Sequence, residues 1–174
     1  MTTPEFRIEL LAKHHRREDF HCGVATLDHY LRTTARQHQR RHISRIFVLV
    51  TNDAPERIRG YYSLSVTEIT VDSIPAGLRR KLPRHGLPAA RLGRLAVDRQ
   101  NRGKSIGRLL LIDAMRRTYK IALDAGLVAL VVDAKDNEAR RFYERHGFQP
   151  LEEHPLTLLM MTDTLTDLFT DNLS

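Results

Sequence analysis

The chain has 174 residues, of which 41% are hydrophobic and 28% are charged. Such a chain is long enough to bury one core, and we predict a single domain over residues 1–174. Twenty-eight basic residues against 21 acidic ones give a net charge of +7, and five of the basic residues are lysines. This excess of arginine favours a phosphate-bearing ligand or a polyanionic partner.

Several classes of protein are excluded by the same sequence. No apolar run approaches the ~20 residues that span a bilayer, and the first residues lack the basic and apolar start of a signal peptide. The single cysteine, Cys22, excludes an internal disulfide framework. The histidines show no spacing typical of a metal site. We therefore expect a cytoplasmic protein that binds neither metal nor membrane.

The first part of the chain alternates between apolar strands and one helical pattern. Apolar, β-branched residues fill the run at 44–51, and turn chemistry follows at 52–55. Leu27, Tyr30 and Leu31 recur at helical spacing. The pattern predicts strands at 6–12, 44–51 and 58–69, the last two forming a hairpin, and a helix at 26–41.

Residues 72–90 interrupt this regularity. Prolines and glycines break any long element, and one helical turn is expected at 78–82. We interpret this stretch as a functional surface insertion. Regular elements then return, and the pattern predicts strands at 91–97, 127–132 and 156–161 and helices at 106–125 and 137–146. Strands that alternate with helical connections predict a mixed α/β sheet.

The loop at 98–107 has the composition of an anion site. It leads into the start of a helix, where backbone N–H groups without partners and the helix dipole both attract anions. Gly103 and Gly107 allow a close approach, Ser105 adds a hydroxyl donor, and Lys104 and Arg108 add positive charge. The pattern is neither a nucleotide P-loop nor a dinucleotide fingerprint, and it favours a pyrophosphate.

Two motifs then give a resemblance to a known family. Residues 95–98 (LAVD) followed by 102–107 (RGKSIG) resemble motif A of the GNAT superfamily of N-acetyltransferases, with Ser105 in the place of the middle glycine. Residues 137–148 (NEARRFYERHGF) resemble motif B. This resemblance implies a mixed, mostly antiparallel sheet flanked by helices and acetyl-CoA as cosubstrate. It also implies that the coenzyme is bound by Leu95, Ala96, Val97, Arg102, Gly103, Lys104, Ser105, Ile106, Gly107, Arg108 and Asn137.

Tyr143 lies where the superfamily commonly carries a catalytic tyrosine. A phenol with a pKa near ~10 can protonate a departing thiolate, so we expect Tyr143 to act as general acid. The neighbouring Phe142 is expected to fill the core, which leaves Tyr143 to face the coenzyme. No general base is identified, since neither Glu68 nor Asp98 has a compelling spacing. An α-amine with a pKa near ~8 reacts without a dedicated base, which favours an α-amine acceptor.

The likeness extends further along the chain. Residues 20–31 (FHCGVATLDHYL), 61–64 (YYSL) and 92–98 resemble the TacT-like acetyltransferase toxins of bacterial type II toxin–antitoxin modules. This resemblance implies acetylation of the α-amine on charged tRNA, which blocks translation. It also implies a ribbon-helix-helix antitoxin encoded nearby and a homodimer.

The charge distribution agrees with an RNA substrate. Residues 61–108 carry a net charge of +7, as large as that of the whole chain. Contacts to RNA are expected from Arg79, Arg80, Lys81, Arg84 and Arg91, and secondarily from Arg36, Arg40 and Arg41. Two alternatives remain open: an acetyltransferase of a small amine or a protein N-terminus, and a non-catalytic module that binds RNA or an antitoxin.

Overall fold

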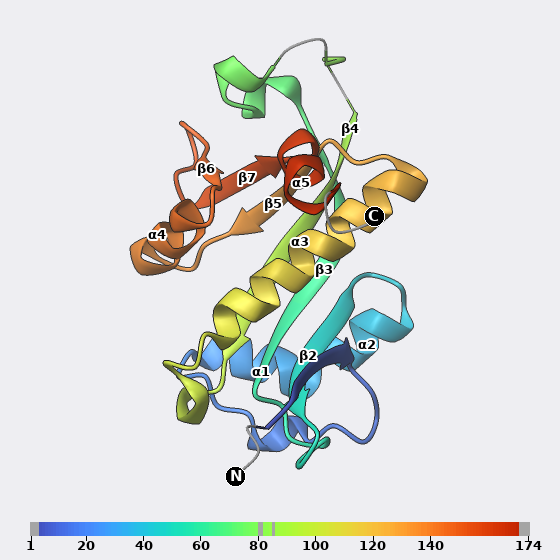
Figure 1. The fold of residues 1–174 in the computed structure, drawn as a ribbon, viewed down its shortest axis with the longest axis vertical. Helices are drawn as coiled ribbons and strands as arrows, with labels where there is room; N and C mark the ends of the chain where they lie inside the picture. Colours follow the sequence, from blue (N-terminus) through green and yellow to red (C-terminus); the bar gives the residue numbers. More distant parts are fainter. Residues whose placement is uncertain (1–3, 80–81, 85, 171–174) are drawn as a thin grey trace. The chain divides into compact units, whose positions relative to one another are not determined.

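The computed structural model describes residues 4–79, 82–84 and 86–170. Within these ranges the chain forms seven strands and five α-helices (Figure 1). The strands are β1 (Phe6–Leu10), β2 (Arg45–Thr51), β3 (Gly60–Ile69), β4 (Leu87–Val97), β5 (Ala129–Asp133), β6 (Gln149–Pro150) and β7 (Thr157–Met161). The helices are α1 (Ala25–Thr33), α2 (Ala35–Arg40), α3 (Ile106–Ala125), α4 (Asn137–Arg145) and α5 (Thr162–Phe169). Short 3-10 turns are η1 (Arg17–Asp19), η2 (Val71–Ser73), η3 (Ala76–Leu78) and η4 (Arg99–Asn101).

The strands form one sheet in the order β1-β2-β3-β4-β5-β7-β6. The pairs β1–β2, β2–β3, β5–β7 and β6–β7 are antiparallel, whereas β4–β5 is parallel. The parallel pair is joined through α3, the kind of crossover that parallel strands require. The predicted mixed, mostly antiparallel α/β fold is confirmed.

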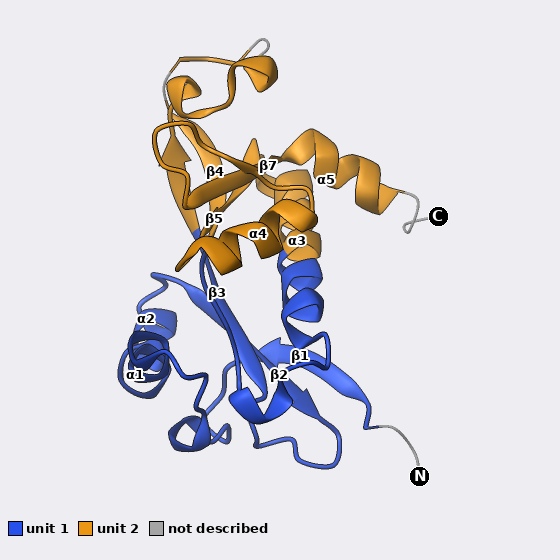
Figure 2. Cartoon of the chain, turned by 90° about the vertical axis from the view of Figure 1, so that its left-hand side faces the viewer, with its two compact units in different colours: residues 1–65, 93–114 blue, residues 66–92, 115–174 orange. Residues whose placement is uncertain are grey.

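The chain divides into two compact units, which are coloured separately in Figure 2. Unit 1 comprises residues 1–65 and 93–114, and unit 2 comprises residues 66–92 and 115–174. Strands β3 and β4 and helix α3 each contribute residues to both units.

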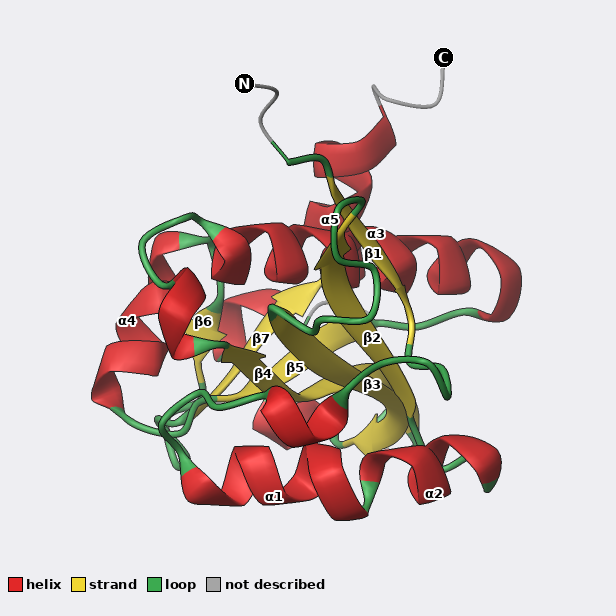
Figure 3. Ribbon diagram, turned by 90° about the horizontal axis from the view of Figure 1, so that it is seen from below, coloured by secondary structure: helices red, strands yellow, loops and turns green. Residues whose placement is uncertain are grey.

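In unit 1, helices cover both faces of the strands. Figure 3 shows α1 and α2 on one side of β2 and β3, with α3 on the other. On the α1 side, alternate residues of β2, Ile46 and Val48, join Leu31 and Tyr61 in a cluster that includes the buried Cys22. On the α3 side, the Tyr62 hydroxyl donates to Asp113 at 2.6 Å.

In unit 2, a second core lies between the sheet and the insertion that precedes β4. Ile74 of the insertion packs with Leu87 and Ala89 of β4, Val131 of β5 and Leu159 of β7. Leu87 and Ala89 both join this core because residues two apart in a strand point to the same face of the sheet. The insertion therefore has an apolar side that covers part of the sheet.

The helix predicted at 26–41 is wrong in one respect, because the chain forms two helices that meet at Thr34. The Thr33 hydroxyl donates to the His29 carbonyl at 2.8 Å and lies 3.1 Å from the Thr34 hydroxyl. Adjacent β-branched residues with hydroxyls that bond to the preceding turn disfavour a regular helix.

The segment around the insertion also differs from the prediction. Strand β4 begins at Leu87, four residues before the predicted start, because Ala89 to Leu92 pair with β5. A helical turn lies at Ala76–Leu78 instead of 78–82. Arg80 and Lys81 lie outside the described residues.

Two short elements were not predicted, β6 and α5. The two-residue β6 is too short to produce a periodic signal. Helix α5 follows β7 directly, and its first residue is held by a hydrogen bond of 2.5 Å from the Thr162 hydroxyl to the Leu127 carbonyl. None of the helices in the described ranges is long and apolar enough to cross a membrane.

Candidate active site

The predicted phosphate loop joins β4 to α3 within unit 1. Gly103 has φ +79° and Ser105 has φ +60°, while Lys104 between them has an ordinary negative φ. The Leu109 N–H donates to the Ser105 carbonyl at 3.1 Å, so the helical ladder begins there. By helix geometry, the N–H groups of the three preceding residues are left for an external acceptor. Ser105 thus adopts the left-handed backbone for which the family pattern has glycine.

Successive residues with alternating φ form a concave array of N–H groups that binds anions. The helix dipole adds partial positive charge at the same place. Lys104 and Arg108 are exposed beside the array, whereas the Ile106 side chain is buried and anchors the first turn of α3. The geometry therefore fits a pyrophosphate, bound by backbone groups and flanking cations, and Gly107 lies half-buried in the same turn.

The strand before the loop offers a second feature that fits the coenzyme. The parallel register of β4 with β5 runs from Ala89 to Leu92, and β4 continues for five residues beyond it, Gly93–Val97. Leu95, Ala96 and Val97 lie on this extension. Ala96 is 5% exposed and packs in the unit 1 core, while its two neighbours are half-buried. A pantetheine arm with its own amide groups can pair with backbone of this kind, as an added strand does.

Unit 2 contains the two predicted residues of motif B. Asn137 is exposed at the first position of α4, directly after Asp136, whose carboxylate caps the helix by accepting from the Ala139 N–H at 2.8 Å. Tyr143 is only 4% exposed and packs edge-on against Phe148, with the ring centroids 5.8 Å apart.

The burial expected of the two adjacent aromatic residues is reversed. We expected Phe142 to be the core residue, but it is half-buried and Tyr143 is buried. The phase of α4 decides this, since position 143 is the one buried position of the helix. Burial, with a smaller contribution from the charge of Asp133, raises the pKa of Tyr143 above its ordinary value. The phenol is protonated at neutral pH, as a general acid must be, and burial makes it a weaker acid than a phenol in water.

Asp133, the last residue of β5, was not predicted as a site residue. Its Oδ2 accepts from Nη1 of Arg91 at 2.6 Å, and both side chains are about one third exposed, at 37% and 36%. Arg91, which we predicted to contact RNA, is thus paired within unit 2. A carboxylate that directly ends a buried strand (LVALVVD) is a signal that could have identified Asp133.

A cavity of about 270 Å³ lies beside this ion pair. Its lining combines apolar side chains from the sheet with polar ones at the end of β3 and in the β6–β7 loop. The lining residues are Glu68, Ile69, Thr70, Ser73, Arg91, Val131, Leu151, His154, Thr157 and Leu159. The cavity was not predicted, because it is assembled from four separate segments.

The structure distinguishes the two carboxylates considered as bases. Asp98 is 4% exposed and accepts from the backbone N–H groups of Gln100 at 3.0 Å and His21 at 3.1 Å. Both of its oxygens are used to hold the loop. Glu68 is exposed and lines the cavity. Glu68 is therefore the one of the two that can meet a ligand.

Among the predicted RNA contacts, the described arginines differ in how they are held. Arg79 is exposed, but its guanidinium donates to the carbonyls of Ile74 at 2.7 Å and Asp72 at 3.1 Å. The Arg79 side chain therefore helps to hold the insertion in its folded conformation. Arg84 is exposed nearby in the chain.

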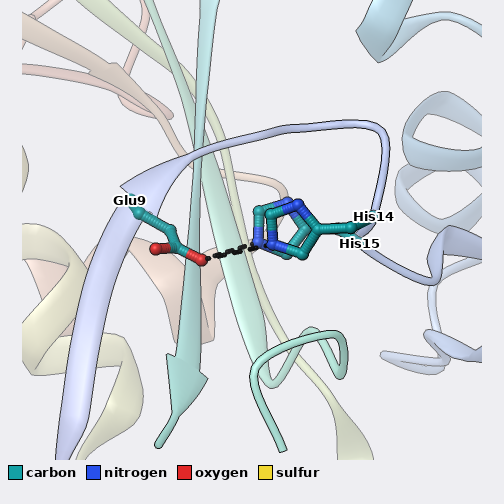
Figure 4. A group of neighbouring side chains, drawn as sticks. All are labelled: Glu9, His14 and His15. Atoms are coloured by element: carbon teal, nitrogen blue, oxygen red, sulfur yellow. Dashed lines mark hydrogen bonds and ion pairs between the residues drawn. The ribbon is translucent and has the colours of Figure 1, made fainter.

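One histidine cluster has the composition of a metal site but a different arrangement. Figure 4 shows the side chains of Glu9, His14 and His15 close together, with candidate ligand atoms within 4.8 Å of one another. The Ala12 N–H donates to Nδ1 of His15 at 2.8 Å, so the ring proton is on Nε2, which lies 2.8 Å from the Glu9 carboxylate. His15 therefore has no lone pair available for a metal, and the cluster braces the end of β1.

A coenzyme A-dependent acyltransferase requires a helix start that binds the pyrophosphate and, before it, strand backbone that can pair with the pantetheine arm. The fold and the site therefore define this chain as a protein of that class. The family is the acetyltransferase (GNAT) domain family, whose model matches residues 21–150, and the chain belongs to it. The protein is thus an acetyltransferase that uses acetyl-CoA.

Known proteins resemble this chain over most of its length. A tRNA-acetylating toxin of Mycobacterium tuberculosis is 35% identical over 142 residues, which cover 82% of this chain and 83% of the toxin. The structure of AtaT complexed with acetyl-methionyl-tRNAfMet matches with a TM-score of 0.88 and 30% identity, covering 95% of this chain and 99% of that one. A tyrosine-to-phenylalanine mutant of the AtaT toxin, bound to the C-terminus of the antitoxin AtaR and acetyl-CoA, matches with a TM-score of 0.81 and 29% identity, covering 95% and 98%.

Proposed function

We propose that this chain is the toxin of a type II toxin–antitoxin module and transfers an acetyl group from acetyl-CoA to the α-amine of an aminoacyl-tRNA. The observation that carries the proposal is the left-handed Gly103 and Ser105 at the start of α3, which present an anion-binding array to the coenzyme. The relatives that acetylate tRNA, and that bind antitoxin and acetyl-CoA, support the choice of substrate and partner.

In this reaction the acceptor nitrogen forms a bond to the acetyl carbonyl carbon, and the bond from that carbon to sulfur breaks. The nitrogen loses one proton to water, and the departing sulfur takes one. We assign the second proton to the Tyr143 hydroxyl, which is protonated at neutral pH like any phenol. Alignment of the two substrates supplies much of the remaining acceleration.

The cavity in unit 2 is our candidate for the acceptor site. Its volume of about 270 Å³ leaves room for a small polar group such as the amino-acid end of the acceptor. Val131 and Leu159 give it an apolar floor, and Glu68 places a carboxylate at its rim. A carboxylate there would orient the neutral α-amine of the acceptor by accepting a hydrogen bond from its N–H.

The acetyltransferase activity is tested by incubating the protein with acetyl-CoA and charged tRNA and measuring acetylation of the aminoacyl ester. Tyr143→Phe should keep the affinity for acetyl-CoA and lose about 100-fold in turnover. Unmodified aminoacyl esters, together with acetylation of a peptide or a small amine, would overturn the tRNA proposal. Unchanged turnover in Tyr143→Phe would remove the phenol from the mechanism.

The basic insertion is the proposed contact to the tRNA backbone. Arg84→Ala should weaken tRNA binding and reduce the slope of log affinity against log salt by about one unit. Arg45→Ala, which removes another exposed arginine, at the start of β2, is the control. Equal slopes for both variants would assign Arg84 to another role.

The remaining partners are part of the same proposal. We expect a ribbon-helix-helix antitoxin encoded nearby, a homodimer, and action in the cytoplasm, where charged tRNA is found. Expression of the chain alone should arrest growth, and co-expression of the neighbouring small reading frame should restore it. Growth without arrest would favour an acetyltransferase of a small metabolite.

A further inference from the structure

The segment His21–Gly23 belongs to the motif at residues 20–31, and the proposed reaction gives it no role. It is nevertheless bonded to the first residues of the phosphate loop. The His21 N–H donates to Oδ2 of Asp98 at 3.1 Å, and the His21 carbonyl accepts from the Arg99 N–H at 2.9 Å. The turn and the start of the loop are therefore joined in both directions.

A third bond comes from a side chain. Nη2 of Arg102, the first residue of the family's loop pattern, donates to the Cys22 carbonyl at 2.6 Å. The N–H of the same Cys22 donates to Oδ1 of Asp28 at 2.8 Å. Cys22 and Asp28 are 5% and 8% exposed. Arg102 is thus bonded to a backbone group that α1 and the unit 1 core hold in place.

Gly23 provides the space for this bond. It has φ +91°, and a Cβ built on it would lie 3.0 Å from Nη2 of Arg102. An ordinary side chain at this position would both strain the backbone and press on the guanidinium. A Cβ at position 23 would therefore require the Arg102 guanidinium to shift by a few tenths of an ångström.

We propose that Arg102 is a positioning residue that attaches the phosphate loop to the Cys22–Gly23 turn, instead of binding the pyrophosphate directly. This inference rests on the proposed function, because acetyl-CoA is the ligand that it concerns. The loop contains two exposed left-handed residues, Gly103 and Ser105, and ordering them at the moment of binding costs conformational entropy. An anchor at Arg102 orders the loop beforehand. Lys104 and Arg108 remain to contact the phosphates.

The test is a double-mutant cycle on acetyl-CoA affinity, measured by calorimetry. Gly23→Asn retains a residue type that tolerates a left-handed backbone, but its Cβ displaces the guanidinium without removing any charge. We expect Gly23→Asn and Arg102→Ala each to weaken binding about tenfold, and the double variant to lose no more than either alone. Gly77→Ala is the matched glycine control, because a Cβ there meets nothing within 4 Å.

A direct phosphate contact predicts a different result. Gly23→Asn would then bind acetyl-CoA as tightly as the native chain does, or the double variant would lose affinity by the product of the two single losses. Either outcome overturns the inference. Arg108→Ala, which we expect to act on phosphate directly, should instead multiply with Gly23→Asn. If thermal unfolding shows that Gly23→Asn does not fold, Asp28→Ala loosens the same turn and should weaken binding only while Arg102 is present. A native chain that binds no acetyl-CoA would refute the proposed function, not this anchor.

Discussion

Ser105→Gly should make the protein more stable, although it removes a side chain. Ser105 has φ +60°, a left-handed conformation that costs an L-residue about 1–2 kcal/mol and costs glycine nothing. Against this gain, glycine adds roughly 0.5–1 kcal/mol of backbone entropy to the unfolded chain. The net gain lies between roughly 0 and 1.5 kcal/mol in the free energy of unfolding, with a middle value of about 0.7 kcal/mol. For a chain of this length, that raises Tm by about 2 °C.

Differential scanning calorimetry on the protein without ligand measures this difference. Ser105→Ala is the control, because alanine also loses the hydroxyl but retains the cost of the left-handed backbone. We expect Tm to rise for the glycine variant alone. If neither variant melted above the native protein, there would be no strain to relieve at this position. If both did, the gain would come from loss of the hydroxyl. Either result would refute the reasoning about the loop.

Three further predictions concern packing and pH. Gly60→Ala places a Cβ 2.8 Å from Leu110 Cδ1 and 3.1 Å from a backbone oxygen, so it should destabilise by about 2 kcal/mol in chemical denaturation, while Gly77→Ala should be neutral. Burial lowers the pKa of His15 below 6.5 despite its bond to Glu9, so as the pH falls the histidine is protonated in the unfolded chain before it is protonated in the folded one. The free energy of unfolding should therefore decrease as the pH drops below 6.5. His15→Gln should make thermal melting less dependent on pH in this range. Because the pKa of Tyr143 is raised, its proton is retained beyond pH ~10, and the pH–rate profile should show no loss of activity from this group below that value.

Much of the fold could be predicted because its patterns are local. The helix at 106–125 was predicted with the observed ends, since an anion loop precedes it and Gly126, with φ +78°, ends it. The break at Thr34 depends on hydroxyl bonds to the preceding turn, which periodicity does not reveal. The start of β4 depends on pairing with β5, forty residues away in the chain.

In the candidate site, too, local features could be predicted from the sequence, whereas contacts between distant segments could not. The phosphate loop is one continuous segment, so its residues could be named from sequence. The partners of those residues could not. Asp98 and Glu68 looked equivalent as carboxylates near strand ends, and only the folded chain shows that backbone N–H groups occupy both oxygens of Asp98. Arg102 and Cys22 are eighty residues apart, and no local pattern connects them.

The proposed coenzyme loop of unit 1 and the proposed acid of unit 2 treat charge in opposite ways, and their chemistry explains why. The coenzyme brings a permanent negative charge, so the proposed contacts Lys104 and Arg108, exposed at a helix start, can pair with it while they remain partly hydrated. The leaving sulfur needs a proton from a group that is neutral beforehand. Burial of Tyr143 disfavours only the charged phenolate, and the charge of Asp133 acts in the same direction. Arg91 in turn compensates the charge of Asp133 at 2.6 Å, which lets a carboxylate remain near the phenol. In the proposed transfer, a buried acid and an exposed anion site therefore meet complementary requirements.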